Sequence, residues 1–164
     1  MKSLILLLLL LSGCGYQFSG GQLPGDIRLL YLPLAANRTA EPLLENKLAG
    51  PVTAVLARQK GVELVASESH ADAVLNGTIS RYSVIPISYD ANDRISVLQA
   101  TMVVRYQLVQ QRDGKLLWQG DLMRQETYNA VVDKNAQEDL ESIAIEMLAK
   151  NIADDLLSRL VNRF

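Results

Sequence analysis

Cysteine and histidine are nearly absent from this 164-residue chain, which contains one of each, Cys14 and His70. A single cysteine cannot form a disulfide within the chain, and the two residues together are too few for a clustered transition-metal site or a nucleophilic Cys–His pair. No glycine-rich phosphate-binding loop is present either. The sequence therefore predicts no catalytic residues, no metal site, no cofactor and no enzymatic activity.

An excess of positive charge is also lacking, because 16 Lys and Arg residues face 18 Asp and Glu residues, for a net charge of −2. This balance argues against a nucleic-acid partner. The adjacent Asp154 and Asp155 do not make a catalytic carboxylate pair, since neighbouring residues on a helix point about 100° apart. We expect them on a solvated helix face, and we expect His70, within the polar stretch SESHAD, in an exposed loop.

The N-terminus has the pattern of a secretory signal. Lys2 is followed by an apolar run from Leu4 to Leu11 that is too short to span a bilayer, and then by the small residues Ser12 and Gly13. The sequence LSGC, residues 11–14, resembles the bacterial lipobox, which implies cleavage before Cys14 and acylation of its thiol. The alternative is a buried free cysteine that happens to follow the signal.

The lipobox resemblance sets the expected domain organisation and location. Residues 1–13 form a signal peptide that is removed, residues 14–25 a lipidated tether rich in glycine, and residues 26–164 a single domain. Because Gly15 rather than aspartate follows Cys14, the resemblance implies anchoring in the outer membrane, on its periplasmic side. The resemblance also implies that Cys14 carries more than one hydrocarbon chain, which stable attachment requires.

The first half of the domain predicts a strand, a helix and a short strand. Residues 26–34 are rich in strand-forming residues. Thr39 has the properties of a helix N-cap, and an apolar stripe follows at helical spacing: Leu44, Leu48, Val52 and Val55. We expect a kink at Pro51 and an end at Gly61. Residues 62–65 predict a short strand.

The second half predicts three strands and a long helix. Residues 73–82, 95–109 and 116–128 have strand patterns, and the middle one alternates most clearly, with even-numbered apolar residues from Leu98 to Leu108 on one face. Asp113-Gly114 predicts a two-residue hairpin turn. From Asn135 the period becomes helical, and Asn135 with Glu138 resembles a capping box. A broad apolar stripe runs along this helix.

These elements indicate the α+β class. We expect two helices packed on one face of a mostly antiparallel sheet of about four strands. The other face of the sheet, which carries Gln99, Thr101, Arg105 and Gln107, should meet water or a partner.

The order of several segments resembles the LptE family of lipopolysaccharide-assembly lipoproteins. These segments are GCGYQFSG, LPGDIRLLYLPLAANRT, ADAVLNGTISRYSVIPISYD and DGKLLW, followed by an amphipathic C-terminal helix. The resemblance implies a non-enzymatic outer-membrane lipoprotein that plugs the barrel LptD, helps the barrel assemble and binds lipopolysaccharide. The competing interpretations are a pilotin that escorts a secretin and an accessory subunit of the barrel-assembly machine.

Strand direction locates a candidate lipopolysaccharide contact. A two-residue turn at Asp113-Gly114 brings residue 95 close to residue 132, so the loops 83–94 and 129–135 should share one tip of the sheet. Each loop holds a cation, Arg94 and Lys134, and neither has an acidic partner at helical spacing. The alternative is that both are solvated cations that bind nothing.

Overall fold

The computed structural model describes residues 23, 24 and 26–161. The predicted signal peptide, Cys14 and most of the tether lie outside these described residues. The elements are β1 (Leu29–Tyr31), β2 (Ala36–Asn37), α2 (Leu44–Ala57), β3 (Glu63–Val65), the 3-10 helix η2 (Glu68–His70), β4 (Ala73–Tyr89), β5 (Ile95–Gln110), β6 (Leu116–Asn129) and α3 (Lys134–Val161).

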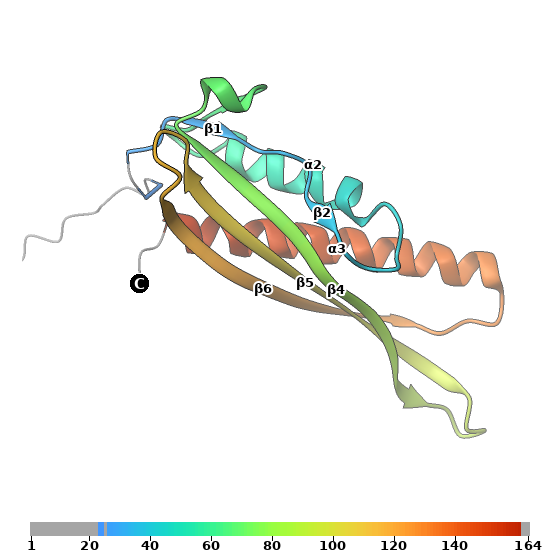
Figure 1. Cartoon of the computed structure of the whole chain (residues 1–164). Coiled ribbons are helices and arrows are strands. Elements are labelled where there is room, and N and C mark those ends of the chain that lie inside the picture. The colour runs from blue at the N-terminus through green and yellow to red at the C-terminus, as the bar shows by residue number, and fades with distance from the viewer. Residues whose placement is uncertain (1–22, 25, 162–164) are drawn as a thin grey trace, which may run out of the picture.

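Both helices lie on one face of a single sheet, as the sequence predicted (Figure 1). The salt bridge between Lys47 of α2 and Glu146 of α3, 2.8 Å long, links the two helices. The sheet itself differs from the prediction, because it has six strands and is mixed rather than mostly antiparallel with about four. Its order is β3-β1-β4-β5-β6, with β2 paired to β4.

The parallel part of the sheet arises from the crossover through α2. β1, α2 and β3 form a strand–helix–strand unit, and a helical crossover returns the chain in the same direction, so β3 pairs parallel to β1. The predicted strand at 26–34 is in fact β1, which stops before Pro33, and β2 resumes along β4. Proline lacks the donor that a continuous strand would need there.

The three long strands carry the antiparallel part and the core. Even-numbered residues of β5 from Ala100 to Leu108 are fully or almost fully buried, which confirms the predicted alternation. In β4 the residues that face the core change from odd positions to even ones, which are only half-buried, at a bulge around Ser80, where Ile79 pairs with Val104 but Arg81 pairs with Val103. The bulge keeps Tyr82 and Val84 on the face of β4 that packs against the core, despite the change in numbering.

The hairpin between β5 and β6 is longer than predicted. The amide of Gln110 donates to the carbonyl of Lys115 (2.9 Å), which leaves residues 111–114 in the loop, and Gly114 adopts a positive φ of 69°. Past a bulge near Leu108, Val97 pairs with Asn129, one residue from the predicted register.

The helix starts also differ from their predictions. α2 begins at Leu44, after Leu43 in a left-handed conformation, and Thr39 instead donates its amide to Asn37 Oδ1 (3.0 Å). α3 begins at Lys134, and the carboxylate of Asp133 accepts the amide of Ala136 (2.8 Å). Asp133 is therefore the N-cap, not Asn135. The predicted apolar stripe of α2 is buried, and the helix is continuous through Pro51.

Candidate interaction surface

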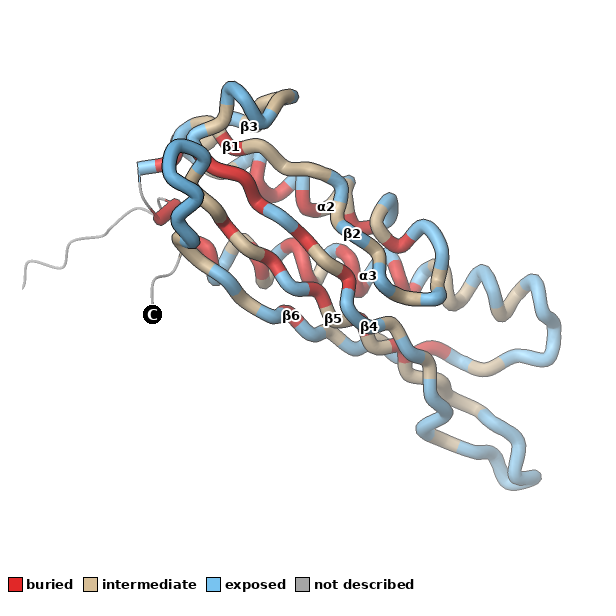
Figure 2. The backbone as a smooth tube through the Cα atoms, viewed as in Figure 1, coloured by how far each residue is buried: buried red, intermediate tan, exposed pale blue. Residues whose placement is uncertain are grey.

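The end of the molecule where β4 and β5 are joined extends past the helix layer (Figure 1). We call residues 84–95 the distal hairpin. β4 continues to Tyr89, not Tyr82 as predicted, so the connecting loop is residues 90–94 and not 83–94. No helix lies over this part of the sheet in Figure 1, and most of its tube in Figure 2 has the colour of exposed residues. Its large apolar side chains are about half exposed: Ile85, Ile87, Tyr89 and Ile95.

The turn of the distal hairpin is fixed by one carboxylate. Asp90 Oδ1 accepts the amides of Asn92 (2.7 Å) and Arg94 (3.0 Å), and the amide of Asp90 donates to the carbonyl of Arg94 (2.8 Å). Asp93 takes a left-handed φ of 60°. These bonds set where Arg94 leaves the turn.

Lys134 lies at the same end of the molecule, at the start of α3, but the distal hairpin and α3 diverge in Figure 1. Its Nζ is 3.6 Å from Glu138 Oε1, one helical turn away. The expectation that neither cation has an acidic partner at helical spacing is therefore wrong for Lys134, because the helix begins one residue earlier than predicted. Both partners are largely exposed, so this pair is weak.

The connection from β6 to α3 adds two more exposed apolar side chains, Val131 and Val132, of which Val132 is 98% exposed. The amide of Val131 donates to Gln137 Oε1 (2.8 Å), which ties the loop to the first turn of α3. The distal end thus combines exposed apolar side chains from two segments with the cations Arg94 and Lys134. These are the kinds of group that can contact an amphiphile with a phosphorylated head, and they lie among the carboxylates Asp90, Asp93, Asp133 and Glu138.

A cluster of two tyrosines and two glutamates lies at the edge of the core near this end, and the sequence did not predict it. The hydroxyl of Tyr82 donates to Glu141 Oε1 (2.7 Å), and burial followed by this bond raises the Tyr82 pKa. Burial and then the charge of Glu141 raise the Tyr128 pKa to about 12. Burial and then Glu141 also raise the pKa of Glu41. The only sequence feature that could have indicated this cluster is the placing of Tyr82 and Tyr128 at core-facing positions of β4 and β6.

The open face of the sheet, opposite the helices, is largely polar, as predicted. Its one strong pair is bidentate, with Arg105 donating to both carboxylate oxygens of Asp121 at 2.7 and 3.0 Å. Gln125 donates weakly to Thr101 Oγ1 (3.4 Å), and Met123 is an exposed apolar exception. This face offers many modest hydrogen-bonding groups rather than an apolar patch.

Two sites singled out in the sequence are placed by the structure. His70 ends the exposed 3-10 helix η2, as expected for a surface residue. Asp154 is exposed, but Asp155 is not on a solvated face, because its side chain is only 12% exposed and pairs with Arg124 and Arg159. The expectation for Asp155 was wrong because β6, distant in sequence, supplies the second arginine.

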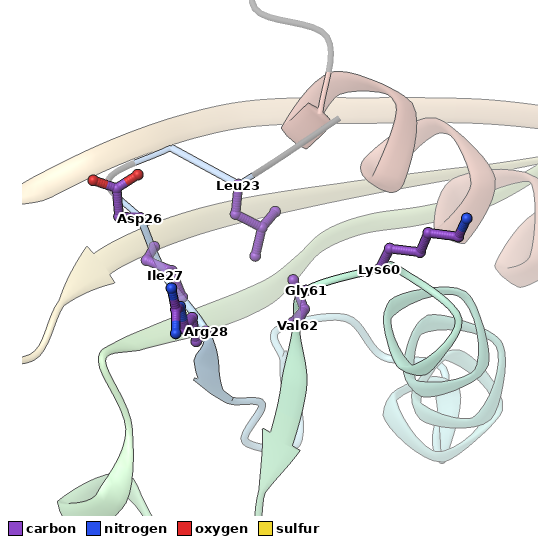
Figure 3. Close-up of a pocket in the computed structure, with 7 residues that line it drawn as sticks. All are labelled: Leu23, Asp26, Ile27, Arg28, Lys60, Gly61 and Val62. Atoms are coloured by element: carbon purple, nitrogen blue, oxygen red, sulfur yellow. The ribbon is translucent and has the colours of Figure 1, made fainter. Parts of the chain in front are cut away.

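The opposite end of the molecule has an open pocket of about 520 Å³ (Figure 3). Charged and apolar side chains line it, from the segment before β1 and from the turn between α2 and β3. Asp26, Arg28 and Lys60 carry its charges without converging on one point. Among residues 23, 24 and 26–161, no group of His, Cys, Asp and Glu could hold a metal ion. None of the helices described is long and apolar enough to cross a membrane.

One comparison with known proteins shows the family of this chain, and another shows its fold. The family model described as LptE, lipopolysaccharide-assembly, matches residues 27–163. No curated protein matches the sequence significantly. Solved structures with this fold include lipoprotein B from Nitrosomonas europaea (TM-score 0.63, 10% identity, covering 91% of this chain and 90% of that one) and rare lipoprotein B from Shewanella oneidensis (0.55, 13%, 80% and 92%). A minor lipoprotein from Acinetobacter baumannii is also similar (0.51, 15%, 82% and 90%).

Proposed function

Because this chain belongs to the LptE family of lipopolysaccharide-assembly proteins, we propose that it is a non-enzymatic outer-membrane lipoprotein that plugs the barrel LptD and helps that barrel assemble. The family match over residues 27–163 is the observation that carries the proposal. Cys14 anchors the mature chain, the tether follows it, and the remaining residues form the single domain. The anchor places the domain on the periplasmic side of the membrane.

The chemistry of the surface supports a plug. A barrel lumen is polar, so a plug needs a surface with many hydrogen-bonding groups and no dominant apolar anchor. The open face of the sheet has this character, with Thr101, Gln107 and Gln125 among its residues. The opposite surface is more apolar, because Ile143 and Met147 are exposed on the outer side of α3.

Photo-crosslinking from opposite faces tests the plug. A photoreactive residue is placed at Gln107 on the open face, at Met147 on the outer side of α3, and at Glu68 in η2, and complexes are purified in mild detergent. We expect both Gln107 and Met147 to crosslink to the same barrel protein, because a barrel surrounds its plug. Crosslinks from one face alone, or to a secretin or another assembly subunit, would contradict the proposal. Glu68 serves as the comparison position, on the short helix η2 at the end of the sheet where β4 begins.

We also propose that the distal end contacts lipopolysaccharide. Arg94 and Lys134 supply charge-assisted hydrogen bonds to phosphate, and the exposed apolar side chains of the distal hairpin, Ile87 and Tyr89 among them, lie along acyl chains. Since the two cations occupy separate segments, each forms its own contact rather than one shared site. The contribution of each should fall as salt is added, because both are exposed.

Charge reversal tests this contact. The double variant Arg94→Glu/Lys134→Glu should weaken binding of the purified chain to lipopolysaccharide by about tenfold or more, which is about 1.4 kcal/mol. The melting temperature should hardly change, because exposed charges contribute little to stability. The matched control is Arg112→Glu/Lys115→Glu, which reverses two charges at the other end of β5 and β6. Equal affinities of wild type and the distal variant at low salt would exclude this site.

A further inference from the structure

The sheet has one long edge that lacks the usual protection against pairing with another strand. The β3 edge has only three residues, and the part of β4 that lacks a second neighbour contains Pro86 and is broken by register shifts. Such features discourage strand addition. β6, by contrast, forms the other edge with 14 residues, and none of them is a proline.

The register shows which groups of β6 point away from the sheet. The amide of Ala130 donates to the carbonyl of Ser96 (3.0 Å), so even-numbered residues of this segment form the bonded pairs with β5. No register shift interrupts the pairing between Asn129 and Trp118. The odd-numbered residues from Gln119 to Asn129 therefore direct their amides and carbonyls outward, where another strand would bind.

Two arginines occupy outward carbonyls at the middle of this edge. Arg159 Nη1 donates to the carbonyl of Asp121 (3.3 Å), and Arg124 Nη1 donates to the carbonyl of Met123 (3.0 Å). Asp155 holds both guanidinium groups, at 2.8 Å from Arg124 and 3.0 Å from Arg159. α3 thus places Asp155 and Arg159, one helical turn apart, against β6.

We propose that Arg124, Asp155 and Arg159 form an edge guard that keeps β6 from pairing with the β6 of a second copy of this chain. An antiparallel pair of identical strands is self-complementary about a twofold axis, so the second copy is always available as a partner. The guard opposes this pairing in two ways. The guanidinium groups fill acceptors that the incoming strand needs, and pairing about an axis near Leu122 would bring two sets of arginines together.

The experiment removes the guard as a unit. In Arg124→Met/Asp155→Leu/Arg159→Met no buried charge is left unpaired, which limits the loss of stability. The full mature chain is measured by sedimentation velocity in excess detergent over a range of protein concentrations. We expect the triple variant to dimerise with a dissociation constant at least tenfold lower than that of the wild type. Arg105→Met is the matched control, because Arg105 also pairs with an aspartate but touches no edge carbonyl.

A second substitution shows whether any dimer uses this edge. Gln125→Pro removes an outward amide from β6 without removing a backbone hydrogen bond to β5, and it costs only the weak side-chain bond to Thr101, so in the triple variant it should restore the monomer. A triple variant that stays as monomeric as the wild type would overturn the proposal, as would one that dimerises equally with Gln125→Pro. If the triple variant does not fold, Arg159→Met alone must show a weaker shift toward dimer, because Asp155 keeps Arg124; no shift would also overturn the proposal.

Discussion

At the scale of single residues, position 77 in β4 must be glycine because the ring of Tyr106 lies very close to its backbone. A Cβ at this position would lie 2.8 Å from Cε1 of Tyr106 and 3.1 Å from Cβ of Ala35. Tyr106 is buried and cannot easily move. The glycine is therefore required by the packing of the β4–β5 pair and not by its own backbone conformation.

We predict that Gly77→Ala lowers the free energy of unfolding by about 1 to 3 kcal/mol, as overpacking in a core does. Urea denaturation measures it. Gly50→Ala is the matched control, because the site is inside α2 and, apart from the adjacent residues and the helix's own backbone, nothing lies within 4 Å of a Cβ at Gly50. That variant should change the free energy of unfolding by less than about 1 kcal/mol, because the higher helix propensity of alanine is opposed by the clash of its Cβ with the ring of Pro51. A stable Gly77→Ala chain would mean that Tyr106 is free to shift.

Asp72 is a charged residue that connects β1 and β4, two of the parallel strands. Its Oδ2 accepts the amides of Arg28 and Leu29, both at 2.9 Å, and its own amide donates to the carbonyl of Leu29 (2.8 Å). The bonds from Leu29 and then Arg28 lower the Asp72 pKa below its ordinary value. The carboxylate thus fastens the start of β1 to the start of β4.

A lowered pKa means that the folded state favours the charged form, so this stabilisation is present at neutral pH and is lost as the pH falls below the usual aspartate range. Asp72→Asn should therefore lower the free energy of unfolding at pH 7 by about 1 kcal/mol, a modest value because the site is exposed. The difference from wild type should shrink toward zero in acid. Urea denaturation at several pH values measures it, and a constant difference would contradict the role of the charge.

At the scale of elements, the start of α3 depends on Asp133. The Asp133 carboxylate accepts the Ala136 amide, and the Gln137 side chain accepts the Val131 amide, so the loop and the first turn hold each other. A carboxylate at this end of a helix also interacts favourably with the helix dipole. Asn135, although it is also a good capping residue by type, lies inside the helix.

We predict that Asp133→Ala lowers the free energy of unfolding by about 1 kcal/mol, the usual value for loss of an N-cap. Asn135→Ala should be neutral or slightly stabilising, because alanine is the better helix former. Thermal unfolding followed by circular dichroism compares the two. If Asn135→Ala were the less stable of the two variants, Asn135 rather than Asp133 would be the N-cap.

At the scale of the whole molecule, the proposed lipid anchor at Cys14 can be tested directly. If Cys14 is acylated, the mature chain begins at Cys14 and carries the mass of its acyl groups. Cys14→Ser should then leave the chain uncleaved or wrongly cleaved, without lipid, and should remove it from the outer-membrane fraction. Mass spectrometry of the purified wild-type chain checks the first point. An unmodified thiol, or a mature start elsewhere, would contradict the lipoprotein anchor.

Local patterns in the sequence determined the class and most of the elements. Alternation in residues 95–109 specified β5 and its buried face, because successive side chains of a strand point to opposite sides. Helical spacing specified the buried stripe of α2, because residues three and four apart lie on the same face of a helix. The order of motifs indicated the LptE family, which the family match confirms.

Only the tertiary structure decided which strands pair, how far they extend and which charges meet. The parallel pairing of β1 and β3 depends on where the α2 crossover returns, and the extension of β4 to Tyr89 depends on β5 as its partner. Asp155 shows the same limit, because its spacing on α3 indicates a solvated residue and only the packing of α3 against β6 supplies Arg124. Local periodicity predicts which way each side chain points, but it does not predict which distant segment that side chain will contact. The contact depends on how the helices pack on the sheet.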